Sequence, residues 1–150
     1  MDFLLRCLAE CAAAFIGTAA FALLFSIPKK YYFFGGGIGA AGWLAYRLLG
    51  LVCGRVIAVF LGTVAVILLS RLLAVREKCP VTEFMVPGLF PLVPGAGIYW
   101  TVYELVMENP SAASQHGFES FQDVIAIVLG IIVVFELPQK LFHFAGRKKE

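Results

Sequence analysis

The chain has 150 residues, of which 61% are hydrophobic and only 15% are charged, and its mean hydropathy is +0.89. Soluble domains are usually about 45–50% apolar and about 25% charged, so this composition excludes an ordinary soluble domain and indicates an integral membrane protein. The net charge of +2 is too small to suggest a nucleic-acid partner, and the four cysteines and two histidines lack the spacing of a metal site.

The hydropathy pattern predicts an all-α integral membrane protein with a single transmembrane domain over residues 1–150. Each of five apolar stretches approaches or exceeds the roughly 20 residues that a helix needs to cross a bilayer. These spans are predicted at residues 7–27, 33–52, 55–75, 81–108 and 119–140. The polar residues 109–118 are interpreted as the loop between the last two spans, and Arg71, near the end of the third, is expected to reach the membrane interface.

The second stretch, residues 33–52, is the least regular of the five. Its many glycines weaken a helix in water, so a re-entrant or interfacial segment is the alternative to a full crossing. Gly35 and Gly39, however, have the spacing that lets two membrane helices approach closely. Because the stretch also has the length that a crossing needs, the sequence favours a full span.

The fourth stretch, residues 81–108, is interrupted by prolines and glycines. Pro87, Pro91 and Pro94 each lack the N–H group that would bond back one helical turn. We therefore predict one crossing that is broken near residues 91–95. Lipid cannot satisfy the exposed backbone groups, so the break must face protein or water, as at the substrate sites of many secondary transporters. The alternative is a proline-kinked helix without a ligand.

The start of the second half-helix is suited to a carboxylate. Its free N–H groups and positive dipole end attract an anion, and glycines let the backbone approach a ligand closely. This predicts a small carboxylate-bearing substrate, such as an amino acid or a dicarboxylate. The residues assigned to this site are Pro87, Gly88, Pro91, Pro94, Gly95, Gly97, Tyr99 and Tyr103. The two tyrosines share a helical face, and anchoring at the membrane interface is the alternative for them.

Four ionisable residues in or near the spans are candidates for charge or proton coupling, namely Arg47, Glu83, Glu104 and Glu136. Ionisable residues inside a membrane often mark substrate or proton pathways. Glu136 could carry a proton if it is desolvated, and an interfacial carboxylate is the alternative. Arg47 could attract an anion, and an arginine that reaches the outer interface is the alternative.

No catalytic constellation occurs in the sequence. Neither His116 nor His143 is spaced with a carboxylate or a cysteine as a metal site or a nucleophile–base pair requires. A glycine-rich phosphate-binding motif is also absent from the sequence. We therefore expect neither an enzyme, nor a metal, nor a cofactor.

Basic residues predict the orientation in the membrane. With five crossings, residues 29–30 and 71–78 lie on the same side as the basic tail at 140–149. Lysine and arginine are enriched in cytoplasmic loops. The N-terminus is therefore predicted outside and the C-terminus in the cytoplasm.

The run PGLFPLVPGAGIY at residues 87–99 resembles the PG-x-x-PLVPG-x-x-x-Y signature of the threonine/serine exporter family. Residues 42–46, 78–80 and 127–131 also resemble the small, five-span half of that family. The resemblance implies the small subunit of a split exporter in a bacterial inner (plasma) membrane, with a larger five-span transporter subunit of the same family as its partner. It also implies export of threonine and serine, or of succinate in some bacteria, coupled to the proton gradient.

Two other functions are compatible with the sequence. The chain could be a structural or assembly subunit, in which the broken helix only packs and a partner holds the whole pathway. It could also form a homo-oligomeric channel, which would carry an uncoupled flux without any partner.

Overall fold

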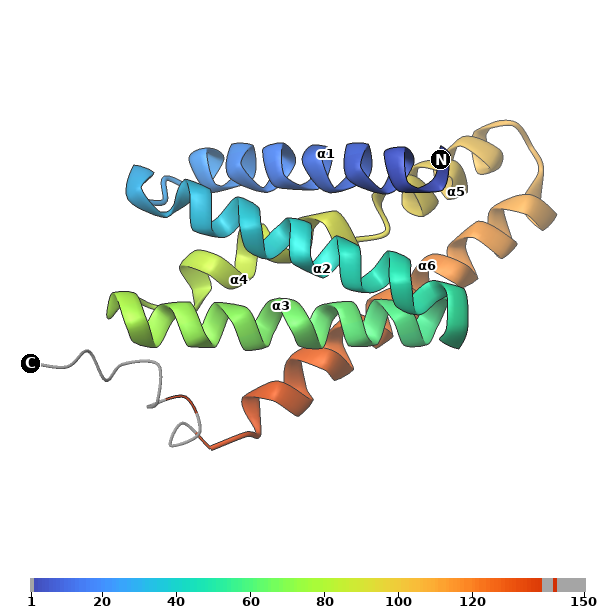
Figure 1. The fold of residues 1–150 in the computed structure, drawn as a ribbon. Coiled ribbons are helices and arrows are strands. Elements are labelled where there is room, and N and C mark those ends of the chain that lie inside the picture. Colours follow the sequence, from blue (N-terminus) through green and yellow to red (C-terminus); the bar gives the residue numbers. More distant parts are fainter. Residues whose placement is uncertain (1, 139–141, 143–150) are drawn as a thin grey trace, which may run out of the picture.

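The computed structural model describes residues 2–138 and residue 142. Within this part of the chain every regular element is a helix and no strand occurs, so the predicted all-α class is confirmed. The elements are α1 (Asp2–Leu24), η1 (Lys29–Tyr31), α2 (Tyr32–Cys53), α3 (Arg55–Glu77), α4 (Thr82–Leu89), η2 (Phe90–Leu92), α5 (Gly95–Val106) and α6 (Pro110–Phe135), where η1 and η2 are single turns of 3-10 helix (Figure 1).

Four helices, α1, α2, α3 and α6, are long and apolar enough to cross a membrane. The segment from α4 through η2 passes the same test together with α5, and the two are bent by 49° at the break between Leu92 and Gly95. Counted as one broken span, this pair gives the five crossings that the sequence predicts. The glycine-rich α2 is one continuous helix of 22 residues, which is long enough for a full crossing.

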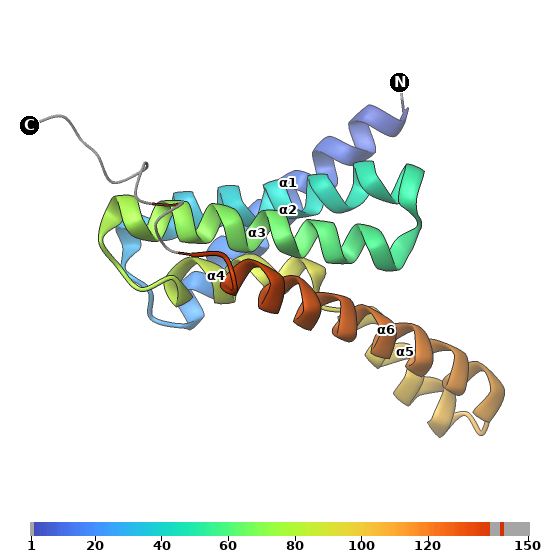
Figure 2. The same ribbon diagram turned by 90° about the horizontal axis from the view of Figure 1, so that it is seen from below.

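The helices form a layer with a projecting hairpin. α1, α2 and α3 lie side by side, and α4 and η2 pack against all three (Figure 1). α6 crosses α3 and continues past the end of this layer, where it pairs with α5 (Figure 2). The α5–α6 hairpin therefore projects from the rest of the molecule.

A single residue, Gly54, connects α2 to α3. Its φ of +78° lies in the left-handed region, where any residue with a Cβ atom is strained. This turn places Arg55, the first residue of α3, at the end of the layer from which the hairpin projects.

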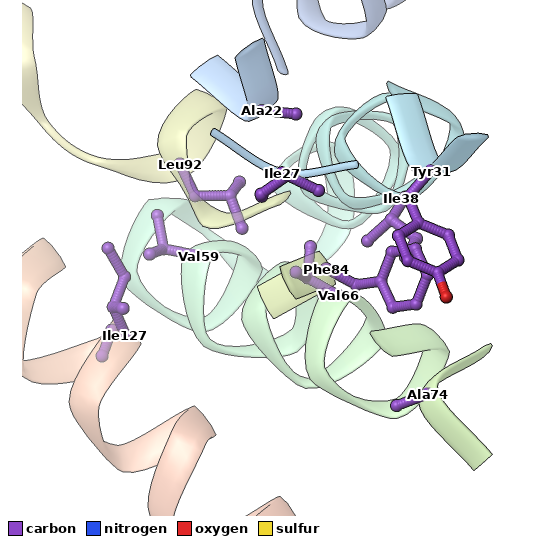
Figure 3. Packing of buried hydrophobic residues seen from close by; sticks show 11 residues of the cluster. Ala22, Ile27, Tyr31, Ile38, Val59, Val66, Ala74, Phe84, Leu92 and Ile127 are labelled. Carbon is purple, nitrogen blue, oxygen red and sulfur yellow. The ribbon is translucent and has the colours of Figure 1, made fainter. Parts of the chain in front are cut away.

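The core lies where α4 meets α2 and α3 (Figure 3). Phe84 of α4 is fully buried, and its ring meets the ring of Tyr31 edge-on, with the centroids 5.1 Å apart. Gly42 of α2 and Gly88 of α4 both pack against the side chain of Val66 in α3. A Cβ atom added to Gly42 would lie 2.2 Å from Val66 Cγ2, and one added to Gly88 would lie 3.1 Å from Val66 Cγ1. Small residues thus let these helices approach closely, as is common in membranes.

This packing makes Gly42 a stability determinant. We expect Gly42→Ala to lower the free energy of unfolding by about 1–3 kcal/mol, because Val66 is fully buried and its branched side chain has few alternative rotamers. Gly37→Ala in the same helix is the matched control: no described atom lies within 4 Å of its added Cβ, so a gain of up to about 1 kcal/mol is expected. Thermal unfolding of the purified protein in detergent measures both, and equal stability of the two variants would contradict the packing.

The loop predicted at residues 109–118 is wrong, because α6 begins at Pro110. The side chain of Asn109 accepts a hydrogen bond from the Ala112 N–H at 3.4 Å, and proline fits the first position of a helix. The polar residues that follow lie on a largely exposed helix surface rather than in a loop. The predicted span 119–140 therefore starts too late; α6 ends at Phe135, and residues 139–141 lie outside the described part of the chain.

Two smaller predictions also change. α1 runs from Asp2 to Leu24 rather than over residues 7–27, and the chain turns at Ser26, whose φ is +57°. The side chain of Arg71, which the sequence predicts to reach the membrane interface, is buried against α6. Its Nη1 donates to the carbonyl of Val134 in the last turn of α6 and to the carbonyl of Leu137, two residues after α6 ends. Except for Phe142, the basic tail at 140–149 and His143 lie outside the described residues.

Candidate functional site

A cavity of about 430 Å³ lies beside the break in the fourth span. This volume is within the range of small-molecule sites. The cavity is lined by Trp43 and Tyr46 of α2, Arg55 and Val59 of α3, residues 91–97 at the break, Trp100 of α5, and His116, Glu119, Ser120 and Asp123 of α6. The break is therefore one wall of a site that four other helices complete.

An ion pair joins α3 to α6 at this cavity. Arg55 Nη1 lies 2.8 Å from Asp123 Oδ2 and 3.8 Å from Glu119 Oε2, and Arg55 Nη2 donates to the Glu119 carbonyl at 3.3 Å. Glu119 and Asp123 are four residues apart, so they share one face of α6. The cavity thus contains one guanidinium and two carboxylates.

Asp123 has an unused hydrogen-bond acceptor. The residue is only 7% exposed, and its Oδ1 atom is buried without a hydrogen-bond partner among the described residues. Leaving a buried carboxylate oxygen unpaired is unfavourable by more than about 1–3 kcal/mol. Because Asp123 also lines the cavity, a ligand with an N–H or O–H donor could satisfy this oxygen.

The N-terminus of α5 faces the same cavity. α5 begins at Gly95, directly after Pro94, and no side chain within the described residues caps its first turn. The first N–H groups of a helix have no intrahelical acceptor and carry its positive dipole end. The cavity therefore has an anion-attracting wall at residues 94–97 and a cation-attracting wall at Asp123 and Glu119.

Comparison with known proteins assigns the family. A family model described as Threonine/Serine exporter, ThrE matches residues 10–136, which include the break and every residue that lines the cavity. The chain belongs to the threonine/serine exporter family. No curated protein and no solved structure matches it significantly.

Membership in the threonine/serine exporter family points to a multi-pass transporter rather than an enzyme. Ser120 and His116 both line the cavity, and the Ser120 hydroxyl donates to the backbone carbonyl of His116 at 2.8 Å. Among the described residues, no group of three or more metal-ligating side chains could hold a metal ion.

Aromatic side chains of α2 form one wall of the cavity in this member of the threonine/serine exporter family. The rings of Trp43 and Tyr46 are 5.2 Å apart, and both line the cavity. Trp43 Nε1 donates to Glu10 Oε2 at 3.1 Å, and the same oxygen lies 2.8 Å from Arg47 Nε. Arg47, a predicted coupling residue, thus lies behind the cavity wall in an ion pair with Glu10, which holds the indole of Trp43 in place.

The residues predicted for the substrate site divide into two groups. Pro91, Pro94, Gly95 and Gly97 line the cavity. The other four do not line it: Pro87 and Gly88 are buried in the core, while Tyr99 and Tyr103 lie on α5 with their rings stacked 6.2 Å apart.

Gly97 has a packing role as well as a place in the cavity wall. A Cβ atom there would lie 2.2 Å from Ser120 Oγ, so glycine lets α5 and α6 approach each other closely. Gly95, in contrast, has no described atom within 4 Å of an added Cβ and borders open space.

The three predicted coupling carboxylates lie away from the cavity lining. Glu83 is in the first turn of α4, and its Oε2 is buried without a partner among the described residues. Glu104 accepts a hydrogen bond from Asn109 Nδ2 at 3.1 Å, at the turn between α5 and α6. Glu136 directly follows α6.

Sequence reasoning missed Arg55, Glu119 and Asp123 as site residues. The available signal was the pair of carboxylates at positions 119 and 123. In a helix that starts at Pro110, both would lie on one face well inside an otherwise apolar span, which would have indicated a functional site. Because residues 109–118 are predicted as a loop and the last span is predicted to begin at residue 119, both carboxylates fall in the first turns of that predicted span rather than well inside it. Arg55 had no sequence signal beyond its position at the start of a span.

Proposed function

We propose that the chain is the small membrane subunit of a bacterial secondary exporter of small amino acids, and that it works with a larger five-span subunit of the same family. The observation that carries this proposal is the cavity at the broken helix, which combines an uncapped helix N-terminus with a buried carboxylate. Family membership supports transport as the activity.

The two walls of the cavity suit the two charges of an amino acid. The substrate carboxylate binds the N–H groups of residues 96 and 97 in the first turn of α5, since the Gly95 N–H donates to the Val93 carbonyl at 2.7 Å. The substrate ammonium binds Asp123 Oδ1, while Arg55 holds the other oxygen of that carboxylate. Trp43 and Trp100 line the space in which the rest of the substrate lies.

The charge balance favours an amino acid over a dicarboxylate such as succinate. The cavity has two carboxylates against one guanidinium, and the guanidinium is already paired with Asp123. A second substrate carboxylate near Asp123 would face a like charge, which is unfavourable by several kcal/mol in a desolvated site. We therefore expect succinate to bind at least about tenfold more weakly than threonine.

The partner subunit is proposed to cover α5. None of the residues of α5 is buried by the described part of the chain, and Tyr99 and Trp100 on this helix are well exposed. The cavity is partly open. A second subunit against α5 would close the substrate site and shield it from lipid.

The proposed location is the inner (plasma) membrane of a bacterial cell, with the N-terminus outside and the C-terminus in the cytoplasm. η1, with Lys29 and Lys30, lies at the same end of the layer as Lys78, where α3 ends (Figure 1). Clustered basic residues favour the cytoplasmic side.

Export from cells that lack their own system tests the proposal. The chain is expressed alone and with a larger subunit of the same family, and the efflux of threonine, serine and succinate is followed with and without a protonophore. We expect protonophore-sensitive efflux of threonine and serine only when both subunits are present, and little efflux of succinate.

Other outcomes would overturn parts of the proposal. Efflux from the chain alone would refute the need for a partner and favour a homo-oligomeric channel if it is insensitive to the protonophore. Efflux of succinate in preference to threonine would refute the role given to Asp123. No efflux of any of the three substrates, with both proteins in the membrane, would refute the exporter.

A further inference from the structure

The two oxygens of the Asp123 carboxylate have different surroundings. Oδ2 accepts a hydrogen bond from Arg55 Nη1 at 2.8 Å. Oδ1 is buried and has no hydrogen-bond partner within the described part of the chain. The side chain as a whole is only 10% exposed, and it lines the cavity at the helix break. One oxygen is thus held by the protein, and the other is available to whatever occupies the cavity.

Either of two cations can satisfy the available oxygen. An ionised carboxylate only accepts hydrogen bonds, so Oδ1 can accept from a substrate ammonium or bind a proton. A buried acceptor without either is unfavourable. Both cannot occupy Oδ1 together, because a protonated carboxyl no longer offers the negative charge that pairs with the ammonium.

We propose that Asp123 is the site at which the proton and the substrate compete, so that binding of one expels the other. This inference rests on the proposed amino-acid exporter and extends it to the coupling mechanism. The incoming ammonium displaces one proton from Oδ1 into the water on the side from which the substrate enters. After the substrate leaves on the opposite side, one proton from that side binds Oδ1. One proton therefore crosses inward for each substrate that crosses outward, and Arg55 remains paired with Oδ2 in both states.

The groups that face Asp123 distinguish it from its neighbours. They are Arg55 of α3, Tyr46 of α2, and Glu119 and His116 of α6, while the part of α5 that lines the cavity has no titratable side chain. The Glu119 side chain is 43% exposed, and its Oε1 lies 3.5 Å from Gln115 Nε2. Asp123 therefore combines deep burial with a free oxygen, which Glu119 does not.

Glu83 is the appropriate comparison, because its Oε2 is also buried without a partner among the described residues. It lies in the first turn of α4 and does not line the cavity. If any buried carboxyl with an unpaired oxygen sufficed for coupling, Glu83 would serve as well as Asp123. The proposal requires that Asp123 alone responds to the substrate.

Proton release on substrate binding tests the competition. The assembly that exports threonine is purified and reconstituted in lightly buffered lipid nanodiscs. Threonine binding is followed by tryptophan fluorescence, because Trp43 and Trp100 both line the cavity, and proton release is followed by a pH indicator. We expect close to one proton released per bound threonine at acidic pH. Where the empty site is protonated, the apparent affinity for threonine should fall about tenfold for each unit by which the pH decreases.

Three variants test whether the released proton comes from Asp123. Asp123→Asn should bind threonine at least about tenfold more weakly, release no proton, and lose the pH dependence of binding. Asp123→Glu keeps a carboxylate and should still release a proton, and Glu83→Gln should release as much as the wild type. Threonine binding by the wild type without proton release, or undiminished release by Asp123→Asn, would overturn the competition while leaving the exporter intact. An assembly that neither binds nor exports threonine would instead overturn the proposed function.

Discussion

Replacing Gly95 by leucine is expected to abolish export while leaving the amount of protein in the membrane near that of the wild type. Gly95 is the first residue of α5, and its added Cβ would meet no described atom within 4 Å, so we expect the fold to tolerate a side chain at this position. Because Gly95 lines the cavity, we expect this side chain to enter the cavity and to block the N–H groups of residues 96 and 97, which bind the substrate carboxylate. We expect export to fall at least about 100-fold, because misplacement of a bound group by about 1 Å can already have an effect of that size.

Gly37→Leu is the matched control for this experiment. Gly37 is also an exposed helical glycine without a described atom within 4 Å of its added Cβ, but it does not line the cavity. Export should be close to normal in this variant. Membrane levels are compared by immunoblotting and efflux by following labelled threonine. Normal export by Gly95→Leu would favour the structural or assembly subunit, in which the break only packs.

Replacing Arg55 by glutamine is expected to lower both stability and transport. Removing the guanidinium leaves the buried Asp123 carboxylate without its partner, and breaking a buried ion pair usually lowers stability by about 3–5 kcal/mol. Because the Arg55 side chain is 38% exposed, we expect a value near the lower end, about 3 kcal/mol. The link between α3 and α6 at the cavity is also lost, so export should fall by at least about 100-fold.

A double variant separates the two effects of Arg55. Arg55→Gln with Asp123→Asn leaves no buried unpaired charge at this place, because the remaining carboxylate belongs to Glu119, whose side chain is 43% exposed. The free energy of unfolding should therefore recover by at least about 2 kcal/mol relative to Arg55→Gln. Export should not recover, because the carboxylate that binds the substrate is missing. Thermal unfolding in detergent and efflux from cells provide the two measurements. Additive losses of stability in the double variant would show that the pair is not coupled.

The error at the start of α6 shows how local polarity can mislead. Residues 109–118 are polar enough to predict a loop, yet Asn109 and Pro110 form a good start signal for a helix. The helix does begin at this signal. Its polar residues lie on the exposed surface of α6, which pairs with α5. With that start, Glu119 and Asp123 fall on one helical face well inside a 26-residue helix.

The partnership of Arg55 with Asp123 depends on long-range packing. α3 and α6 run in the same direction: Arg55 meets Asp123, Thr63 meets Gly130, and Arg71 meets the end of α6. The residues of the ion pair are 68 positions apart, and no local pattern indicates which helices will be neighbours.

The sequence by itself determined that this protein is an all-α membrane protein whose fourth span is broken at Pro91–Pro94–Gly95. These features are local, because hydropathy over about 20 residues selects a membrane helix and a proline removes its own hydrogen bond wherever it lies. Only the tertiary structure decided which charges meet at the break. The approach of α6 to α3 and α5 brings Asp123, Glu119 and Arg55 to the start of α5, and glycines such as Gly97 permit that approach. The chemistry of the site therefore depends on packing between helices that are far apart in the sequence. The pattern of neighbouring residues does not predict that packing.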